Sequence, residues 1–436
     1  SVLYNLTFYV DGQEPDIELE FPEEHGYYYE EIPDVGYEHH IKCGLDFTIN
    51  AIDKPFNACA AGIETIFWRY EWNDTMYPIG PGEGIIWGED LVTKYGAMYD
   101  FDMITDYYWY YSNTSSVDIA FNEECMHELY YFAKDNVCQR TQVGYQEIYV
   151  DCTSPQTDIY FPSEHGYYQE YVCDEYLDHV KCGFQFELYA TDLPDNDCNT
   201  GIESIFYRYE WNDTEYPEEA NPGCSILNGS DLVTMYGEDY DISEITDYVW
   251  IRVNDSSAFI HFSEECVHRL YWFAKDNLCH RSNVQNHTIF VDCSEPNVWL
   301  DVSGHGYHPI NDTAGYLKEG KEFTIKSEDN PDTICGVGIE SIFYRYDWNE
   351  QSYPSDDGTG IVHGTELVTI YGDDYDISDI TDYWWYRIDA NNYSKAFDQE
   401  CKHKLYYFAK DNVCQRTDIK EHTFYVDGSI PFVNDY

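Results

Sequence analysis

The sequence predicts an all-β protein made of three tandem β-sandwich domains that carry disulfides. Three observations lead to this fold class. Three sequence phrases recur in the same order along the 436 residues, and each copy is filled with segments of alternating or β-branched and aromatic residues. In addition, no segment shows an apolar stripe of period 3.6 over ten residues. A chain of this length accommodates three domains of ordinary size, each able to bury its own core.

The repeat is defined by phrases that return at nearly constant spacing. The first phrase, GIETIFWRYEWN and its variants, occupies residues 62–73, 201–212 and 338–349. The second begins with a cysteine, at Cys125, Cys266 and Cys401. The third is a Val-Asp pair with a proline four residues after the aspartate, at Asp11, Asp151, Asp292 and Asp427. The aspartates are 140, 141 and 135 residues apart, so the order and spacing indicate internal duplication.

These landmarks predict the domain boundaries. The three repeats occupy residues 12–151, 152–292 and 293–427. Residues 1–11 are expected to be an orphan strand that completes a preceding or neighbouring domain, and residues 428–436 the start of a following strand or a tail. Either the sequence is a window on a longer array, or its ends complete neighbouring subunits by strand addition.

Within the middle repeat, alternation and composition predict the strands. Residues 182–190 alternate with period two, and residues 202–211 are rich in β-branched and aromatic side chains. Residues 270–274 and 288–291 complete the set. A short stretch at Asp241 is expected to form one helical turn. Each repeat is therefore predicted to be a β-sandwich.

The charge balance excludes one class of partner. Lysine and arginine number 23 against 83 aspartate and glutamate, for a formal charge of −60. Nucleic acid is excluded, because phosphate binding needs a basic surface, and anionic membrane surfaces are disfavoured. The sequence contains no run of 18 apolar residues, so it predicts no membrane-spanning helix. The acidity leaves three interpretations open: bound divalent cations, a salty habitat, or plain solubility.

Cysteines and glycosylation sequons together indicate a secreted protein at the cell surface. The chain has 15 cysteines, several at repeated positions, which favours an oxidising, extracellular compartment. Nine Asn-x-Ser/Thr sequons predict N-linked glycans, at Asn5, Asn73, Asn113, Asn212, Asn228, Asn254, Asn286, Asn311 and Asn392. Asn73 and Asn212 share one repeat position and are the better candidates.

The ordered motifs resemble a known family. The succession Gly-Ile-Glu-Ser-Ile-x-Tyr-Arg, Cys-x-His-x-Leu-Tyr-x-Phe-Ala-Lys-Asp-Asn and Phe-Val-Asp is similar to the Ig-like repeats of archaeal and bacterial cell-surface and S-layer-type proteins. Cys125, Cys266 and Cys401 stand where a glycine is usual in that family. The resemblance implies an immunoglobulin-like topology and a spacer, adhesion or lattice role, and it supplies no catalytic residue. Residues 73–117 exceed the family pattern and, being rich in aromatics, are a candidate partner-binding region.

That topology suggests the disulfides. In an Ig-like sandwich the loop between the second and third strands lies at the same pole as the loop between the sixth and seventh. The expected pairs at that pole are Cys59–Cys138, Cys198–Cys279 and Cys335–Cys414, each closing about 80 residues and worth about 4 kcal/mol in the chain-entropy model.

A second set of pairs joins the start of the sixth strand to the end of the seventh. These are Cys125–Cys152 and Cys266–Cys293, with Cys43 and Cys182 as competing partners. Because fifteen is odd, at least one thiol is free or bonds another chain. The candidates for that thiol are Cys401, Cys173 and Cys224. The absence of a Cys-x-x-Cys pair from the sequence argues against a metal–thiolate cluster.

Carboxylates predict calcium at the domain junctions. A linker aspartate, the turn after the second strand and the turn after the sixth should meet at one pole of each repeat. The candidate ligands are Asp11, Asp53 and Asp135; Asp151, Asp192 and Asp276; and Asp292, Asp329 and Asp411. Oxygen ligands from three loops suit Ca²⁺, whereas the competing interpretation is that they are solvated turn residues and caps. The sequence contains no EF-hand loop.

The remaining motifs do not indicate an enzyme. The histidines at His127, His268 and His403, and those at His25, His165 and His305, are expected to be structural. The sequence has no nucleophile elbow, phosphate loop, zinc-protease or dinucleotide motif. The preferred function is a structural subunit of an extracellular filament, sheath or S-layer-like polymer, joined head to tail to other copies of itself through terminal strands. The alternative is a monomeric adhesin or carbohydrate-binding stalk, stiffened by calcium.

Overall fold

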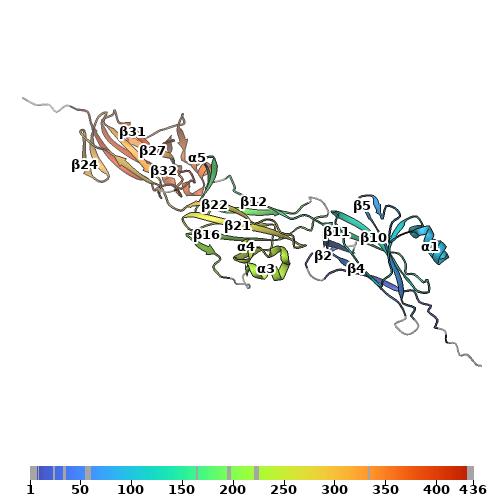
Figure 1. Cartoon of the computed structure of the whole chain (residues 1–436). Helices are drawn as coiled ribbons and strands as arrows, with labels where there is room; N and C mark the ends of the chain where they lie inside the picture. The colour runs from blue at the N-terminus through green and yellow to red at the C-terminus, as the bar shows by residue number, and fades with distance from the viewer. Residues whose placement is uncertain are drawn as a thin grey trace, which may run out of the picture.

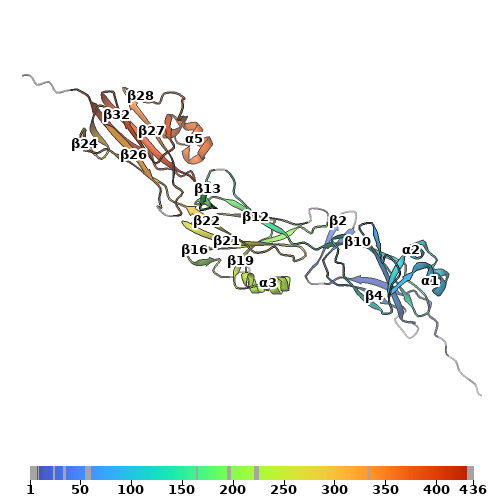
Figure 2. The same ribbon diagram turned by 45° about the horizontal axis from the view of Figure 1, so that its top comes forward.

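The protein forms three β-sandwich modules lined up end to end as an elongated particle (Figures 1 and 2). The strands of module 1 lie within residues 16–151, those of module 2 within 156–292 and those of module 3 within 297–427. This computed structural model describes residues 7, 9–22, 25–32, 36–54, 60–163, 165–193, 198–219, 225–331 and 334–429. The fold confirms the expected class of three tandem all-β sandwiches.

Each sandwich pairs a small sheet with a large one. The small antiparallel sheet of module 1 has the order β1-β4-β9, with β1 (Asp16–Glu20), β4 (Phe47–Ile52) and β9 (Ser116–Ile119). The eight-stranded sheet has the order β2-β3-β11-β10-β5-β8-β7, with β6 beside β5. Its strands are β2 (Tyr27–Ile32), β3 (Gly36–Lys42), β5 (Ile63–Trp72), β6 (Thr75–Tyr77), β7 (Ile85–Trp87), β8 (Tyr108–Ser112), β10 (Cys125–Asp135) and β11 (Gly144–Asp151).

Modules 2 and 3 repeat this topology strand for strand. The strands of module 2 are β12 (Gln156–Tyr160), β13 (Tyr167–Val172), β14 (Glu175–Lys181), β15 (Phe186–Thr191), β16 (Ile202–Trp211), β17 (Thr214–Tyr216), β18 (Ile226–Asn228), β19 (Val249–Val253), β20 (Ser257–Ile260), β21 (Cys266–Asp276) and β22 (Gln285–Asp292). The strands of module 3 are β23 (Asn297–Asp301), β24 (Tyr307–Asn311), β25 (Ala314–Lys318), β26 (Glu322–Glu328), β27 (Ile339–Trp348), β28 (Gln351–Tyr353), β29 (Ile361–His363), β30 (Trp384–Ile388), β31 (Asn392–Ala396), β32 (Cys401–Asp411) and β33 (Lys420–Asp427).

The main core lies between the two sheets. Alternation along β4 turns Phe47 and Ile49 inward, where they meet Leu129 of β10 and Ile148 of β11, and all four are at most 1% exposed. Along β4, alternate side chains thus lie on a buried face and on a more exposed face of the sheet. As expected, the last strand β11 runs antiparallel beside β10, and it also runs parallel beside β3.

A second core covers the outer face of the large sheet. The insert after β6 forms helices that pack Leu91, Tyr99 and Ile104 against Phe67 and Phe132. The insert helices of module 1 are α1 (Gly88–Tyr95), η1 (Ala97–Tyr99) and α2 (Asp102–Thr105). Modules 2 and 3 carry α3 (Gly229–Tyr236), η3 (Glu238–Tyr240) and α4 (Ser243–Thr246), and α5 (Gly364–Tyr371), η4 (Asp373–Tyr375) and α6 (Ser378–Thr381).

Glycine begins the first helix of each insert because nothing larger fits. A Cβ on Gly88 would lie 1.8 Å from the carbonyl oxygen of Ile104, and the same clash occurs at Gly229 and Gly364. The close approach allows Trp109, which is fully buried, to donate its indole N–H to Ile104 O at 3.0 Å.

The second core corrects two expectations. The helical turn near Asp241 is present as α4, but the eight-residue helices before it were not foreseen, because two turns are too short to show a clear 3.6 period. The aromatic-rich insert, expected to be free for partners, is partly occupied by its own core, in which Tyr99 and Trp109 are fully buried. Among the expected orphan-strand residues, those that the structure describes (7 and 9–11) form no strand.

Candidate functional site at the module junctions

Short linkers join the modules, and a disulfide fastens each linker to the module before it. Cys152 follows β11 directly and bonds Cys43, at the end of β3, with a Cα–Cα distance of 4.6 Å. Cys182–Cys293 repeats this bond in module 2. The expected pairs Cys125–Cys152 and Cys266–Cys293 are therefore wrong. The competing partners Cys43 and Cys182 bond instead, because the parallel pairing of β3 with β11 brings their ends together.

Another disulfide crosses from one module to the next. Cys125 of module 1 bonds Cys198 of module 2, and Cys266 of module 2 bonds Cys335 of module 3, with Cα–Cα distances of 5.0 and 4.9 Å. The expected pairs Cys198–Cys279 and Cys335–Cys414 are thus also wrong. The loop that carries Cys198 lies at the expected pole, since Asn277 donates to Thr200 O at 2.7 Å. That pole faces the preceding module, whose β10 begins with Cys125.

Five described cysteines form no disulfide with another described cysteine: Cys138, Cys173, Cys279, Cys401 and Cys414. Cys173 and Cys401 are exposed, in agreement with their nomination as free thiols. Cys59, the expected partner of Cys138, lies outside the described residues, and so does Cys224.

An ion pair and ring contacts complete each junction. Lys42 of β3 pairs with Asp239 of η3, and Lys181 pairs with Asp374 at the next junction. His25 packs against Gly237, and His165 packs against Gly372. Two of the three His-Gly-Tyr histidines thus lie at the module contacts, which the sequence could not show.

Three carboxylate-rich clusters lie at the poles where the linkers enter. Their ligand atoms lie within 4.8 Å of one another in each cluster. We call these groups the first cluster (Asp11, Asp53 and Asp135), the middle cluster (Asp151, Asp276 and His280) and the third cluster (Asp292, Asp329 and Asp411). Each takes a residue from the linker and from the turn after the long central strand, as expected from the sequence.

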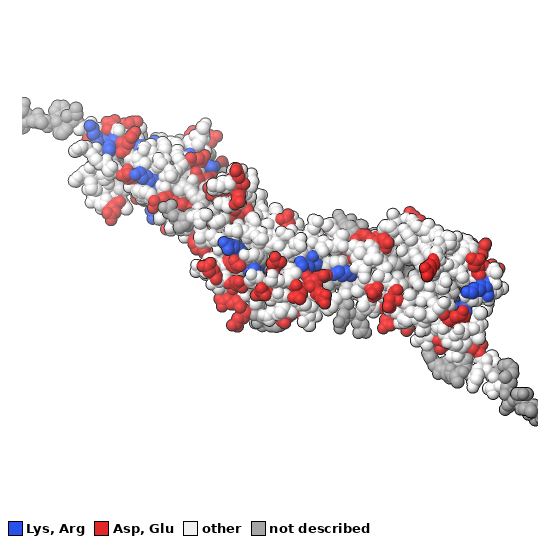
Figure 3. Space-filling view, viewed as in Figure 1, with Lys and Arg blue, Asp and Glu red and all other residues white. Residues whose placement is uncertain are grey.

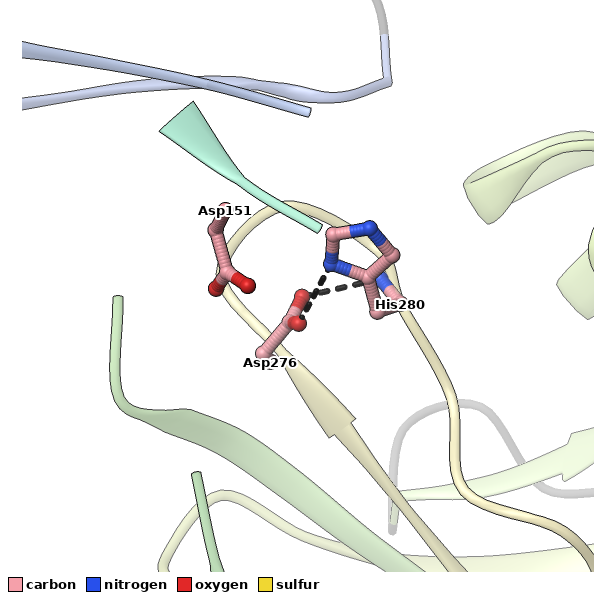
Figure 4. A group of neighbouring side chains, drawn as sticks. All are labelled: Asp151, Asp276 and His280. Atoms are coloured by element: carbon pink, nitrogen blue, oxygen red, sulfur yellow. Dashed lines mark hydrogen bonds and ion pairs between the residues drawn. The ribbon is translucent and has the colours of Figure 1, made fainter. Parts of the chain in front are cut away.

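In the middle cluster a histidine takes the place of the expected third carboxylate (Figure 4). His280 Nδ1 lies 2.9 Å from Asp276 Oδ2, while Asp276 Oδ1 accepts the backbone N–H groups of Leu278 and His280 at 2.8 Å. Asp151 comes from the end of β11 and faces Asp276 (Figure 4). Asp192 lies beside the cluster and accepts the N–H groups of Leu193 and Thr200 at 3.1 and 3.0 Å.

The third cluster leaves three buried oxygens without a hydrogen bond. Among the described atoms, Asp292 Oδ2, Asp329 Oδ1 and Asp411 Oδ2 have no partner. Their sister oxygens each accept at least one backbone N–H, from Ser294, Gly338 and the turn after β32. Asp292 and Asp411 are fully buried. An unsatisfied buried acceptor is costly, so three of them on carboxylates that offer oxygens within 4.8 Å of one another fit a bound cation.

The carboxylates of the third cluster resist ionisation without such a cation. Burial raises the pKa of Asp411 to about 8, and Asp292 and Asp329 reinforce the shift. Burial likewise raises the pKa of Asp292 to about 7 and raises that of Asp329. In the middle cluster, burial raises the pKa of Asp151 to about 7, and Asp192 and Asp276 add to the effect. Crowded buried carboxylates favour protonation unless an opposing charge is present.

The first cluster is more open. Asp11 is partly exposed, and the backbone N–H groups of Ala61 and Gln13 lower its pKa. Asp135 is fully buried, and its burial raises the pKa. Its Oδ1 accepts the N–H groups of Val137 and Gln139 at 2.9 and 2.8 Å. The loop opposite includes residues outside the described ranges.

Other expected sites lie on the surface or in the core. All eight sequon asparagines that the structure describes are exposed, from Asn73 to Asn392, while Asn5 lies outside the described residues. His127 is fully buried and stacks on Phe121 with ring centroids 4.1 Å apart, as His268 and His403 do in their modules. Acidic side chains are scattered in groups over the displayed face of all three modules and outnumber the lysines and arginines there (Figure 3).

In the part of the chain that the structure describes, no helix is long and apolar enough to cross a membrane. No protein-family model matches the sequence, and no curated protein matches it. Among solved structures, similar chains include the FN1–FN3 domains of chicken CNTN1, which are 8% identical with a TM-score of 0.26 over 92% of this chain and 97% of that one.

Two further matches have comparable values. Extracellular domains 3–5 of Drosophila OTK are 7% identical with a TM-score of 0.24, over 94% of this chain and 100% of that one. The fibronectin(III)-like modules of Clostridium thermocellum CbhA are 10% identical with a TM-score of 0.25, over 64% of this chain and 100% of that one. Values this low support no inference about function.

Proposed function

We propose that this chain is a non-catalytic structural protein of the extracellular surface, a subunit of a filament, sheath or S-layer-like polymer joined head to tail. One observation carries the proposal: both described junctions are held by a disulfide that crosses between modules, Cys125–Cys198 and Cys266–Cys335. Such bonds persist in oxidising compartments. A flexible string of independent domains has no need of a covalent bond across each contact.

The junctions are built to resist bending. At each one a crossing disulfide, a linker disulfide and a lysine–aspartate ion pair act at separate points of the contact. Three separated attachments oppose rotation about any single one. The fixed geometry favours a load-bearing or lattice role over a freely articulated tether.

Calcium is the proposed ligand of the carboxylate clusters. The third cluster offers three carboxylate oxygens within 4.8 Å of one another, and Ca²⁺ takes six to eight oxygen ligands at about 2.3–2.6 Å. Asp292, Asp329 and Asp411 would hold the ion. It would neutralise buried charge where the linker enters module 3 and fix the linker to two loops of that module. N-linked glycans on the exposed sequons are part of the same extracellular proposal.

The alternative function is a monomeric adhesin or carbohydrate-binding stalk. Paired exposed tyrosines on the β2–β3 and β13–β14 hairpins favour it. Tyr29 and Tyr37 are 57% and 58% exposed with ring centroids 5.8 Å apart, and Tyr171 and Tyr176 form a similar pair at 4.9 Å. Exposed aromatic rings offer stacking surfaces to sugars or to a neighbouring subunit.

Electron microscopy of the native material, in negative stain, separates the two functions. The structural proposal expects ordered filaments or sheets with an axial repeat set by the three-module unit. Discrete rods that show no order, together with saturable binding on a glycan array, would favour the adhesin. If strand exchange through residues 1–10 builds the polymer, deleting those residues should abolish assembly and leave the modules folded.

A further inference from the structure

Module 3 contains a hollow between its two sheets, bordered by β23 of the small sheet and by β32 and β33 of the large one. The hollow measures about 530 Å³, which is within the range of about 300–1,000 Å³ that small-molecule sites occupy. Its apolar lining includes Val298, Leu300, Val302, Tyr307 and Tyr407, all of which belong to the core of the module. The hollow is therefore large enough for a ligand and lies at the edge of the sandwich core.

The corresponding place in modules 1 and 2 is filled by a phenylalanine. Phe21 follows β1 directly, and Phe161 follows β12 directly. Phe161 stacks on Tyr167 with ring centroids 4.9 Å apart, and Phe21 stacks on Tyr27 at the same distance. In module 3 the residue that follows β23 is Val302, which has no ring. The loss of this ring opens the hollow in module 3.

A buried carboxylate of module 2 is also replaced in module 3. In module 2, Asp178 Oδ2 lies 2.7 Å from His287 Nε2. Gly315 takes the place of Asp178 in module 3, because it has the same register against the last strand. A Cβ at Gly315 would lie 2.3 Å from Cε2 of Tyr307, so no larger residue fits there while Tyr307 keeps its position. His422, the equivalent of His287, therefore lacks the carboxylate partner that His287 has.

His422 leaves a buried nitrogen unsatisfied at the hollow. The residue is 5% exposed and lines the hollow, and its Nε2 has no hydrogen-bond partner among the described atoms. Burial lowers the pKa of His422, so the imidazole is neutral near pH 7 and Nε2 is a donor or an acceptor, depending on the tautomer. A hydroxyl group accepts from the one tautomer and donates to the other. A ligand hydroxyl would therefore satisfy His422 in either state and remove the penalty of an unpaired buried nitrogen.

The other polar groups around the hollow favour a neutral ligand with several hydroxyl groups. Four exposed polar residues line it, namely Asp312, Thr313, Lys420 and Glu421. They combine hydrogen-bond donors with acceptors and carry charges of both signs, so they do not select an ion of one sign. A purely apolar ligand would leave His422 unpaired. A sugar ring meets both requirements, because it has an apolar face and hydroxyl groups around its edge.

We propose that the hollow of module 3 binds one neutral sugar ring, with His422 Nε2 hydrogen-bonded to a hydroxyl and the ring face against Val302 and Tyr407. The sugar has two possible sources. One is an external saccharide, and the other is the chain's own glycan on Asn311, a sequon asparagine next to the lining residue Asp312. The site goes beyond the proposed structural role and does not depend on it, because it lies within one module and apart from the exposed tyrosine pairs of modules 1 and 2.

The test titrates three neutral probes, methyl glucoside, methyl mannoside and N-acetylglucosamine, into the full chain carrying Asn311→Gln, which removes any glycan at that position. Calorimetry and saturation-transfer NMR should show saturable binding of at least one probe. Adding Val302→Phe, which restores the phenylalanine of modules 1 and 2, should abolish this binding. Adding His422→Phe should weaken it about 3- to 10-fold, the effect of one hydrogen bond, and should not lower the melting temperature, because the nitrogen that it removes has no partner. Ile370→Phe is the matched control and should bind like the parent, because Ile370 is exposed on α5.

The same titration of the wild type identifies the source of the sugar. Equal binding by the wild type and Asn311→Gln assigns the site to an external saccharide. Binding by Asn311→Gln alone, with a glycan found on Asn311 of the wild type by mass spectrometry, assigns it to the chain's own glycan. The proposal is overturned if no probe binds Asn311→Gln, if binding is unchanged by Val302→Phe and His422→Phe, or if indole binds in place of the sugars. Electron microscopy tests the polymer separately, so the sugar site and the proposed function fail independently.

Discussion

The middle and third clusters occupy the same place in two successive modules, yet their buried carboxylates have different partners. In the middle cluster His280 Nδ1 lies 2.9 Å from Asp276 Oδ2, and one oxygen, Asp151 Oδ2, has no partner among the described atoms. At the equivalent position of module 3 stands Gln415, whose amide donates to Asp292 O at 3.1 Å. Three carboxylate oxygens of the third cluster are left without a partner among the described atoms.

The difference shows that one scaffold position can be satisfied by a side chain in one module and left open in the next. Asp276 and Asp411 end equivalent strands and accept the same two backbone N–H groups of the following turn. The two turns differ at the residue four positions later, His280 against Gln415, and in the apolar residue Leu278 against Val413. We therefore expect the second junction, at the third cluster, to depend more strongly on calcium than the first.

Removal of a crossing disulfide is expected to have the largest effect on stability, and both junctions contain one. Cys266→Ser or Cys125→Ser removes a disulfide that closes a loop of 69 or 73 residues, and each should destabilise its junction by about 4 kcal/mol. Hydrogen exchange of peptides from β21 and β32 reports local opening. Cys173→Ser is the control and should change nothing. Unequal losses at the two junctions would show that the contacts differ in more than their clusters.

Calcium should have the next largest effect, and mainly on module 3. At a concentration 100 times its Kd, calcium would stabilise the module that binds it by about 3 kcal/mol. Asp411→Asn should abolish this gain in β32. Asp427→Asn is the matched control, because Asp427 ends the last strand of module 3 and accepts Ser429 N at 2.9 Å but is exposed. Equal gains in wild type and Asp411→Asn would contradict a site at the third cluster.

With calcium removed by a chelator, the stability of module 3 should fall as pH rises, because burial raises the pKa of Asp411 in the third cluster. The pKa of Asp411 is raised from 3.8 to about 8, so the folded state retains a proton that the unfolded state releases. Its contribution to stability is fully present below about pH 4 and is lost as pH rises towards 8. Near neutral pH one such proton changes stability by about 1.4 kcal/mol per pH unit. Calcium should flatten this profile, and a stability that rises between pH 6 and 8 in chelator would contradict the assignment.

Exchanging His280 and Gln415 between the two clusters is expected to have the smallest effect, and it tests the comparison directly. His280→Gln should make β21 respond to calcium, and Gln415→His should weaken the response of β32. Each change is expected to shift the calcium effect by about 1 kcal/mol, the net worth of one hydrogen bond. Melting each variant with calcium and with chelator measures the shift. If neither exchange alters the calcium effect, the histidine does not substitute for the ion.

The sequence predicted the sandwich modules and most of the cluster residues because both repeat locally. The strand patterns of β5 and β10 are read directly from alternation and composition. The cluster aspartates end strands that any Ig-like topology brings to one pole. His280 was missed because a single histidine after a cysteine carries no ligand pattern of its own.

The disulfide pairing was not predictable from within one repeat. Cys198 and Cys279 do belong to loops of the same pole, but the nearest partner of Cys198 is in the preceding module. Contacts between modules depend on how two surfaces meet, and the periodicity of a repeat contains no information about that. The same limit hid the pairs Lys42–Asp239 and Lys181–Asp374.

Calorimetric titration of calcium into the chelator-treated full chain tests the central claim most directly. The wild-type protein and Asp427→Asn should bind one tightest equivalent of calcium, and Asp411→Asn should lose that equivalent while the first and middle clusters remain. Retention of the tightest equivalent in Asp411→Asn, or the absence of calcium binding by the wild type, would contradict the account of the third cluster as a cation site that stiffens the junction.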